Sequence, residues 1–286
     1  MTSFVLAALA APIVHHPFQF NVGPLQFTGF GIAVVAAFIV AQHVSQEEMK
    51  RLGADPTPIG DLIFAAIACS LIGAKLYFVV VLGNWDSLFA RGGFVFWGGL
   101  IGGAIGVLTT ARVKKLPIWR ILEVAAAAVA AGYAVGRTGC WAVGDDYGRP
   151  WGGRFAVEFP EGAPASTAAV MTREFGAELP AMDPNTIVSV HPTQLYEVTL
   201  ALIMFGVLWR LRYHRHREGW LFGVYLVMAG VERFIIEFFR AKDDRLGIGL
   251  TTAQTIAIAA FVLGIWMLYT RRGDRVPRVS VAGAQV

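Results

Sequence analysis

Seven predominantly apolar stretches, each about long enough to cross a bilayer, dominate this chain of 286 residues. The hydrocarbon core of a bilayer is about 30 Å thick, so a helix rising about 1.5 Å per residue needs roughly 20 residues to cross it. The stretches are too long for tilted barrel strands and lack strict alternation, which favours helices. We therefore predict an all-α polytopic membrane protein with about seven transmembrane helices, near residues 28–44, 58–82, 95–111, 118–138, 195–211, 219–239 and 251–270.

The composition agrees with a membrane protein. Hydrophobic residues make up 56% of the chain and charged residues 15%, whereas a soluble domain usually carries about 25% charged residues. The net charge of +4 is then typical of Lys and Arg that face anionic lipid, and we expect no nucleic-acid partner. The two cysteines, Cys69 and Cys140, lie in separate segments without a CxxC motif. The sequence therefore predicts no zinc site, no other metal and no disulfide framework.

The distribution of basic residues predicts the orientation. With seven spans, one set of connections holds Lys50, Arg112, Lys114, Lys115, Arg210, Arg212, Arg215, Arg217, Arg271, Arg272, Arg275 and Arg278, whereas the short connection at 83–94 on the other side holds only Arg91. The positive-inside rule places that set in the cytoplasm, with the N-terminus outside and the C-terminus inside. The long connection at about 139–194 then forms a small extracytoplasmic head of short strands or irregular turns. Because there is no internal repeat or low-complexity linker, we expect one membrane domain over residues 1–286. The start, MTSFVLAALAAP, lacks a basic n-region, so we expect no cleaved signal peptide.

Ionisable residues inside or at the ends of spans indicate function, because each costs several kcal/mol unless it is paired or hydrated. The first group is GYAVGRTGCWAVGDDYGRPWGG, residues 132–153. Arg137 offers a rigid fork of donors suited to phosphate, and Asp145 and Asp146 supply carboxylates at the water boundary. Gly139 and Gly148 allow close approach of backbone or ligand. The alternative is an arginine that snorkels to the interface beside glycines that make helix contacts.

The second group is ERFIIEFFRAKDDR, residues 232–245. Arg233 and Glu237 are spaced i, i+4 and can pair on one helix face, which Arg240 continues. Such a pair can simply lock two helices together, but three ionisable groups on one inward face exceed what packing requires.

The third group is HPTQLYE, residues 191–197. His191 lies at the outer boundary, where it can titrate near neutral pH, and Tyr196 is a candidate ligand contact or an ordinary interfacial aromatic. Two arginines aimed at one pocket indicate a phosphate-bearing lipid head group, but do not distinguish an enzyme from a carrier.

Together these stretches resemble the prolipoprotein diacylglyceryl transferase family. Residues 136–148 match its GRxGNxxNxExxG signature at Arg137, Gly139 and Gly148, with Asp145 where the family commonly has Glu. HPTQLYE is similar to its HPxQLYE element, RFIIEFFR at 233–240 to RFxxExxR, and GGLIGG at 98–103 to HGGLxG.

The resemblance implies an enzyme of the bacterial plasma (inner) membrane. It would move the diacylglyceryl group of phosphatidylglycerol onto the lipobox cysteine thiol of a preprolipoprotein, with no cofactor. Arg137 and Arg233 would bind the phosphate and stabilise charge on the leaving group. Glu237 would hold Arg233 in place. The remaining positions, Gly139, Gly148, Tyr196 and Arg240, would belong to the lipid site.

The chain departs from the family pattern at four positions. Trp97 stands where His is typical, Cys140 where Asn is typical, Phe30 at a common Tyr and Lys75 at an expected Arg. Because an indole cannot accept the thiol proton, Asp145 and His191 are candidate bases. A divergent member that binds or moves a phospholipid, or modifies another acceptor, is the alternative. Cys140 is interpreted as a packing residue rather than a nucleophile, and Cys69 as packing. A transporter or scaffold is disfavoured, since no internal repeat is found.

Overall fold

Long helices make up most of the structure, a computed structural model that describes residues 13–83, 85, 95–241 and 249–274. They are α2 (Gly29–Arg51), α3 (Pro58–Leu82), α4 (Phe96–Val113), α5 (Ile118–Val143), α7 (Thr193–Leu211), α8 (Trp220–Ile236) and α9 (Thr252–Thr270). Within the described residues, five of them are long and apolar enough to cross a membrane: α2, α3, α5, α7 and α9. The other two predicted spans are covered by α4, with 18 residues, and α8, with 17. The expectation that no signal peptide is cleaved concerns residues 1–12, which lie outside the described residues.

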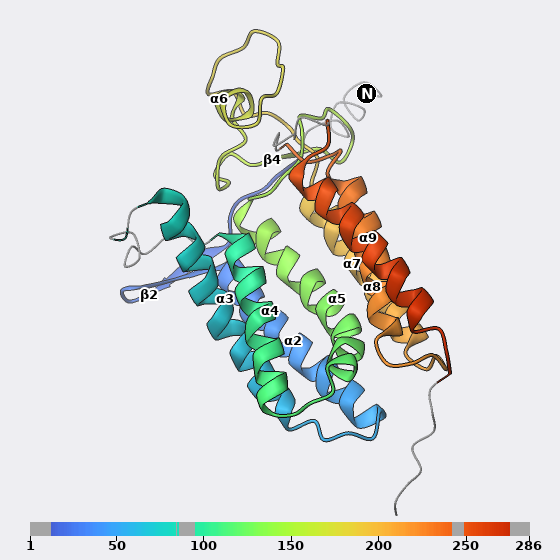
Figure 1. Ribbon diagram of the computed structural model, residues 1–286. Coiled ribbons are helices and arrows are strands. Elements are labelled where there is room, and N and C mark those ends of the chain that lie inside the picture. Colours follow the sequence, from blue (N-terminus) through green and yellow to red (C-terminus); the bar gives the residue numbers. More distant parts are fainter. Residues whose placement is uncertain (1–12, 84, 86–94, 242–248, 275–286) are drawn as a thin grey trace, which may run out of the picture.

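Helix α5 lies in the middle of the bundle, where it packs against α2, α7 and α8 (Figure 1). Its alanines provide the contact surface, with Ala126, Ala127 and Ala130 all at 0% exposure. Small side chains let helix backbones approach closely where lipid gives little hydrophobic driving force between helices. The α5 helix ends at Gly144, whose left-handed φ of 69° is easily adopted only by glycine.

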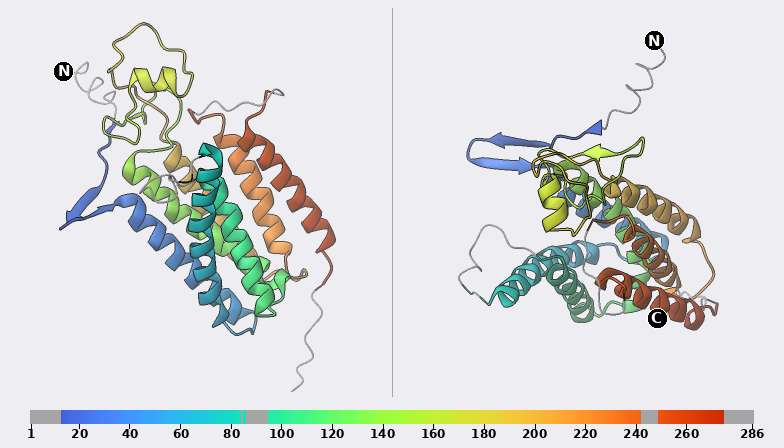
Figure 2. Two further views of the ribbon diagram at one scale, coloured as in Figure 1. Left: turned by 60° about the vertical axis from the view of Figure 1, so that its left-hand side comes forward. Right: turned by 90° about the horizontal axis from the view of Figure 1, so that it is seen from above.

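The other helices form two groups beside α5 (Figures 1 and 2). Helices α8 and α9 pack together, and α7 lies against both α5 and α8. Helices α3 and α4 form a hairpin in which Gly73 and Gly98 lie so close that an added Cβ on either would overlap the other's carbonyl oxygen. This hairpin contacts α2 and α5 through a small apolar cluster that includes Met49, Leu62 and Ile121.

Two small β structures accompany the helices. The sequence predicts short strands only in the long connection. Strands β2 (Gln19–Val22) and β3 (Leu25–Thr28) form an antiparallel hairpin before α2. Strand β1 (Ile13–Val14) pairs in parallel with β4 (Val157–Glu158) in the long connection.

The long connection from α5 to α7 folds around its own apolar core. Its short helix, α6 (Ala168–Arg173), was not predicted. Core side chains include Phe159, Met171 and Val190, each at 0% exposure. In Figure 1 this segment lies beyond one end of the helices, above the end of α5.

Three helix boundaries differ from the predicted ones in ways that matter for the site. Helix α5 runs to Val143 rather than to residue 138, so Arg137 lies well before the helix end instead of at it. Helix α8 ends at Ile236 rather than at 239, so Arg240 follows the helix instead of continuing one face of it. Helix α2 continues to Arg51 rather than to residue 44, because its polar last turns pair with one another and with α7.

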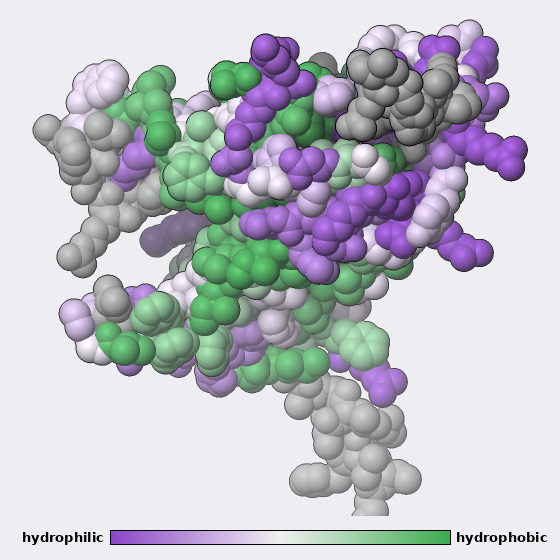
Figure 3. Space-filling view, turned by 90° about the horizontal axis from the view of Figure 1, so that it is seen from below, coloured by the Kyte–Doolittle hydropathy of each residue, from purple (hydrophilic) through white to green (hydrophobic). Residues whose placement is uncertain are grey.

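At the end of the bundle away from the long connection, hydrophilic side chains gather among apolar surface (Figure 3). Several are ion-paired between helices. Lys114 after α4 pairs with Asp61 of α3 at 2.6 Å, and Arg120 of α5 pairs with Glu218 at 2.8 Å. Glu48 of α2, fully buried, accepts from Arg212 after α7. The basic segments identified in the sequence therefore meet at one end of the molecule.

Candidate active site

The buried carboxylate of Glu197, in the second turn of α7, is the point at which three arginines meet. Arg137 of α5 donates to Glu197 Oε1 from Nη2 at 2.7 Å, and Arg233 of α8 donates to the same oxygen from Nη1 at 3.3 Å. Arg240 Nη1 lies 3.9 Å from that oxygen. The structure therefore brings Arg137 and Arg233 together on one carboxylate oxygen, while their predicted place in a lipid head-group pocket stays a prediction. We call Arg137, Arg233 and Arg240 the arginine cluster.

Each arginine of the cluster also has a second acidic partner. Arg233 Nη2 pairs with Glu237 Oε2 at 2.8 Å, as the i, i+4 spacing predicted. Asp146 bridges the other two: its Oδ2 accepts from Arg137 Nη1 and its Oδ1 from Arg240 Nη2, each at 2.7 Å. A carboxylate that receives one guanidinium on each oxygen is held as a phosphate would be.

The exposed fraction of the side chain differs widely among these charged residues. The side chains of Glu197 and Glu237 are 0% and 1% exposed, whereas that of Asp146 is 41% exposed and that of Arg233 is 28% exposed. The cluster therefore meets its surroundings through Asp146 and Arg233, while the other two carboxylates form its interior.

The loop after α5 is fixed to the start of α7 and to the turn after α8. The Thr193 hydroxyl donates to the Asp146 carbonyl at 2.8 Å, and the Gln194 amide donates to the Asp145 carbonyl at 2.6 Å. Gly148 lies against the turn after α8, where an added Cβ would overlap the Phe239 carbonyl oxygen. The predicted close approach at Gly148 is thus between two backbone segments.

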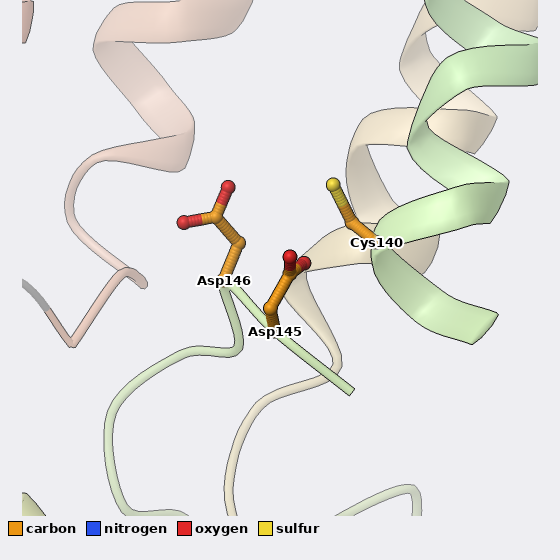
Figure 4. A group of neighbouring side chains, drawn as sticks. All are labelled: Cys140, Asp145 and Asp146. Carbon is orange, nitrogen blue, oxygen red and sulfur yellow. The ribbon is translucent and has the colours of Figure 1, made fainter. Parts of the chain in front are cut away.

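Asp145 takes a different position from its neighbour. Figure 4 shows its carboxyl group beside the Cys140 thiol, with Asp146 on the same loop. One ligand atom from each of the three residues lies within 4.8 Å of the others, a spacing that a metal ion could bridge. However, Arg137 Nη1 already donates to Cys140 Sγ at 3.2 Å and to Asp146. Because the guanidinium supplies the positive charge there, we assign no metal to this group.

The two carboxyl groups have opposite pKa shifts. Burial raises the pKa of Asp145 to about 6, and the negative charge of Asp146 adds to the rise. For Asp146, partial burial opposes ionisation, but Arg240 and Arg137 hold its pKa well below the usual range. At neutral pH Asp146 is therefore a fixed anion, whereas Asp145 lies closer to its titration point and can exchange a proton.

His191 lies just before α7, among aromatic rings. Its ring stacks on Trp151 with centroids 4.3 Å apart, and its Nδ1 is 3.3 Å from the Tyr196 hydroxyl. Burial lowers the pKa of His191. The structure thus brings together the two candidates His191 and Tyr196, and places them next to Phe239 rather than in an ion pair of the arginine cluster.

Gly139 lies at the contact between α5 and α2, where an added Cβ would come within 2.8 Å of Ala33 Cβ and 3.1 Å of Phe30 Cα. This position agrees with the alternative interpretation, in which the glycines of this segment make contacts between helices. The buried Cys140 sits one residue further on.

Sequence reasoning missed Glu197 and gave Asp146 no role of its own. Glu197 is the last letter of HPTQLYE, and an acid in the second turn of an apolar helix is itself a functional signal. Tyr133, also missed, donates its hydroxyl to Glu197 and accepts from Arg137 Nε, both at 3.3 Å.

The fold and the cluster define a helical protein with helices long and apolar enough to cross a membrane and a largely buried cluster of paired arginines and carboxylates. Residues 17–270 match the family described as prolipoprotein diacylglyceryl transferase. The chain belongs to this family.

Curated relatives match along nearly all of the chain. A phosphatidylglycerol–prolipoprotein diacylglyceryl transferase of Oceanobacillus iheyensis is 30% identical over 92% of this chain and 90% of its own length. Proteins of the same name from Proteus mirabilis and Lysinibacillus sphaericus are 27% and 28% identical, over 91% and 90% of this chain and 93% and 92% of their own lengths.

Proposed function

We propose that this protein transfers the diacylglyceryl group of phosphatidylglycerol to the lipobox cysteine thiol of preprolipoproteins. The observation that carries the proposal is the meeting of Arg137 and Arg233 on one buried oxygen of Glu197, in a chain that belongs to the transferase family. The lipid and the signal-peptide segment of the preprolipoprotein are the two substrates. The reaction needs no cofactor, and nucleic acid has no part in it.

In the proposed reaction a carbon–sulfur bond forms and a carbon–oxygen bond breaks. The acceptor sulfur attacks the diacylglyceryl carbon that bears the phosphate ester, and glycerol phosphate leaves with the bonding electron pair. Arg137 and Arg233 stabilise the negative charge that develops on the leaving phosphate, with Arg240 as a third donor. Glu237 and Glu197 hold the guanidinium groups in place. This assignment follows the contacts, since preorganised donors act without rearranging during the reaction.

A base must take the proton of the acceptor thiol, because the thiolate is the nucleophile. We assign this role to Asp145, with His191 as the second candidate. A carboxyl group with a pKa of about 6 is ionised at neutral pH and still basic enough to accept a proton. Gly148 supports the loop that carries Asp145, Gly139 seats α5 against α2, and Tyr196 orients His191.

We further propose seven membrane spans in one domain over residues 1–286, with the N-terminus outside and the C-terminus in the cytoplasm of a bacterium, in its plasma (inner) membrane. Helices α4 and α8, about 27 and 26 Å long, would cross with the five longer ones. The gathering of basic segments at one end supports a cytoplasmic position for that end. The connection at 144–192 would then form the extracytoplasmic head.

The test is mass spectrometry of a lipobox peptide after incubation with the purified protein and phosphatidylglycerol. The diacylglyceryl peptide should form with the parent protein and be lost in Arg137→Ala and in Arg233→Ala. The matched control is Arg120→Ala, which removes another paired arginine from α5 at the opposite end. Retained product in both site variants would refute the assigned phosphate site.

Trp97 favours a second candidate function, that of a divergent member which binds or moves a phospholipid, or modifies another acceptor. It lies at the start of α4 where the family resemblance leads one to expect His. If the parent protein makes no product and Trp97→His makes it, the second candidate is correct. If the parent protein is active, it is excluded.

A further inference from the structure

Among the residues that the structure describes, Asp146 is the one acidic partner of the arginine cluster that reaches the protein surface. Counted over the ion pairs alone, the charges of the cluster cancel, because three guanidinium groups face the carboxylates of Glu197, Glu237 and Asp146. The buried carboxyl group of Glu232 also lies within electrostatic reach of these arginines. A phosphodiester carries one further negative charge. Adding it to a neutral, largely buried cluster is unfavourable unless one carboxylate leaves.

The exposures indicate which carboxylate leaves. Glu197 and Glu237 have side chains that are 0% and 1% exposed, so neither can reach water without unpacking the helices. The Asp146 side chain is 41% exposed. Its backbone carbonyl accepts from the Thr193 hydroxyl, so the carboxylate would leave by rotation of the exposed side chain while the backbone stays in place.

The contacts of Asp146 are those that a phosphate would make. Its two oxygens each receive a guanidinium hydrogen bond at 2.7 Å, one from Arg137 and one from Arg240. A phosphate group presents oxygens of the same charge type to the same donors, so the two anions compete for one place.

We propose that Asp146 is a resident counter-anion, which occupies the phosphate position between Arg137 and Arg240 and swings out when the anionic lipid binds. This inference rests on the proposed function, because it takes the phosphate of phosphatidylglycerol as the competing anion. With the carboxylate displaced, the three arginines outnumber their remaining paired carboxylates, Glu197 and Glu237, by one, which matches the single charge of a phosphodiester. Asp146 thereby sets the affinity for the lipid without touching the reacting atoms.

The test compares phosphatidylglycerol binding by the full-length protein and its variants in phosphatidylcholine nanodiscs containing graded amounts of phosphatidylglycerol. Asp146→Asn keeps the size and one acceptor oxygen but removes the charge, so we expect the dissociation constant to fall about tenfold. Asp146→Ala, a second neutral variant, should also bind more tightly. Asp146→Glu keeps the charge and should stay within about threefold of the parent protein. The control Glu178→Gln removes an exposed carboxylate of the long connection and should leave binding unchanged.

Kinetics separate this role from a structural one. In Asp146→Asn the KM for phosphatidylglycerol should fall about tenfold while kcat stays within about twofold, whereas a merely structural role would lower kcat. Unchanged or weaker lipid binding in both neutral variants would overturn the inference. So would equal tightening in Asp146→Glu. If the parent protein binds the lipid but transfers nothing, the proposed function fails, and the binding comparison still decides the role of Asp146.

Discussion

Replacing Glu197 with Gln should loosen the arginine cluster, and the structure allows the cost to be worked out. The carboxylate accepts two guanidinium hydrogen bonds, at 2.7 Å from Arg137 and 3.3 Å from Arg233. Hydrogen bonds to charged groups contribute about 1.5–3 kcal/mol and neutral ones about half as much, so losing the charge removes roughly 2–3 kcal/mol. Asp146 and Glu237 still pair with the arginines, which keeps the cost below the roughly 3–5 kcal/mol of a fully broken buried pair.

Two measurements on Glu197→Gln follow from this magnitude. At about 2–4 °C per kcal/mol, thermal unfolding in detergent, observed by tryptophan fluorescence, should shift down by roughly 5–10 °C. Transferase activity, measured well below that midpoint, should fall at least about 100-fold, because small misplacements of catalytic groups are that costly.

The matched control is Glu48→Gln, since Glu48 is equally buried and is held by Arg51 and Arg212 at the opposite end of the bundle. It should cost comparable stability and leave the activity of the folded protein intact. Parent-like stability and activity in Glu197→Gln would refute the reasoning. An equal loss of activity in both variants would assign the effect to general destabilisation.

Three further predictions concern the residues around the cluster. Gly148→Ala should lower activity at least about tenfold, because the new Cβ would overlap the Phe239 carbonyl oxygen and push the loop away; the peptide assay tests this, and full activity would contradict it. With Asp145 as the base and its pKa at about 6, the transfer rate should fall about tenfold per pH unit below that pKa and level off above it. Asp145→Asn should abolish this limb of the pH–rate profile, and an unchanged profile would exclude Asp145. Arg137→Lys should retain under about 1% of activity although the charge remains, because an ammonium group cannot donate to two acidic partners in the planar geometry of a guanidinium; near-parent turnover would show that charge alone suffices.

The helices could be predicted from the sequence because long apolar runs leave few alternatives, and α3, for instance, covers the predicted residues 58–82. The C-terminal end of α5 could not be predicted from the sequence. Arg137 resembles a boundary residue when its partners are unknown, but Glu197, 60 positions away, and Asp146 both accept from its guanidinium and so compensate its charge inside the helix. The β2–β3 hairpin and α6 escaped prediction because neither has a strong periodic pattern.

The candidate site was predictable in part. Arg137 and Arg233 stood out because isolated charges in apolar helices are costly, and i, i+4 spacing was enough to pair Arg233 with Glu237. Spacing contains no information on which helices face one another, so the central place of Glu197 was missed. The sequence favours Asp145 as a site residue because of its place in the family signature. In the structure it is Asp146 that accepts hydrogen bonds from the arginines.

The long connection leaves the helical bundle and returns to it through a narrow neck. Gly148 N donates to His191 O at 2.8 Å, and Trp151 N donates to Ser189 O at 2.9 Å, so the outgoing and returning chains run side by side. Everything between them forms a closed excursion whose two ends meet. The excursion is also fastened outside this neck, because β4 pairs with β1 and the Ala163 amide donates to the Gly144 carbonyl at 3.0 Å, so its position relative to the end of α5 is set by contacts from three parts of the chain.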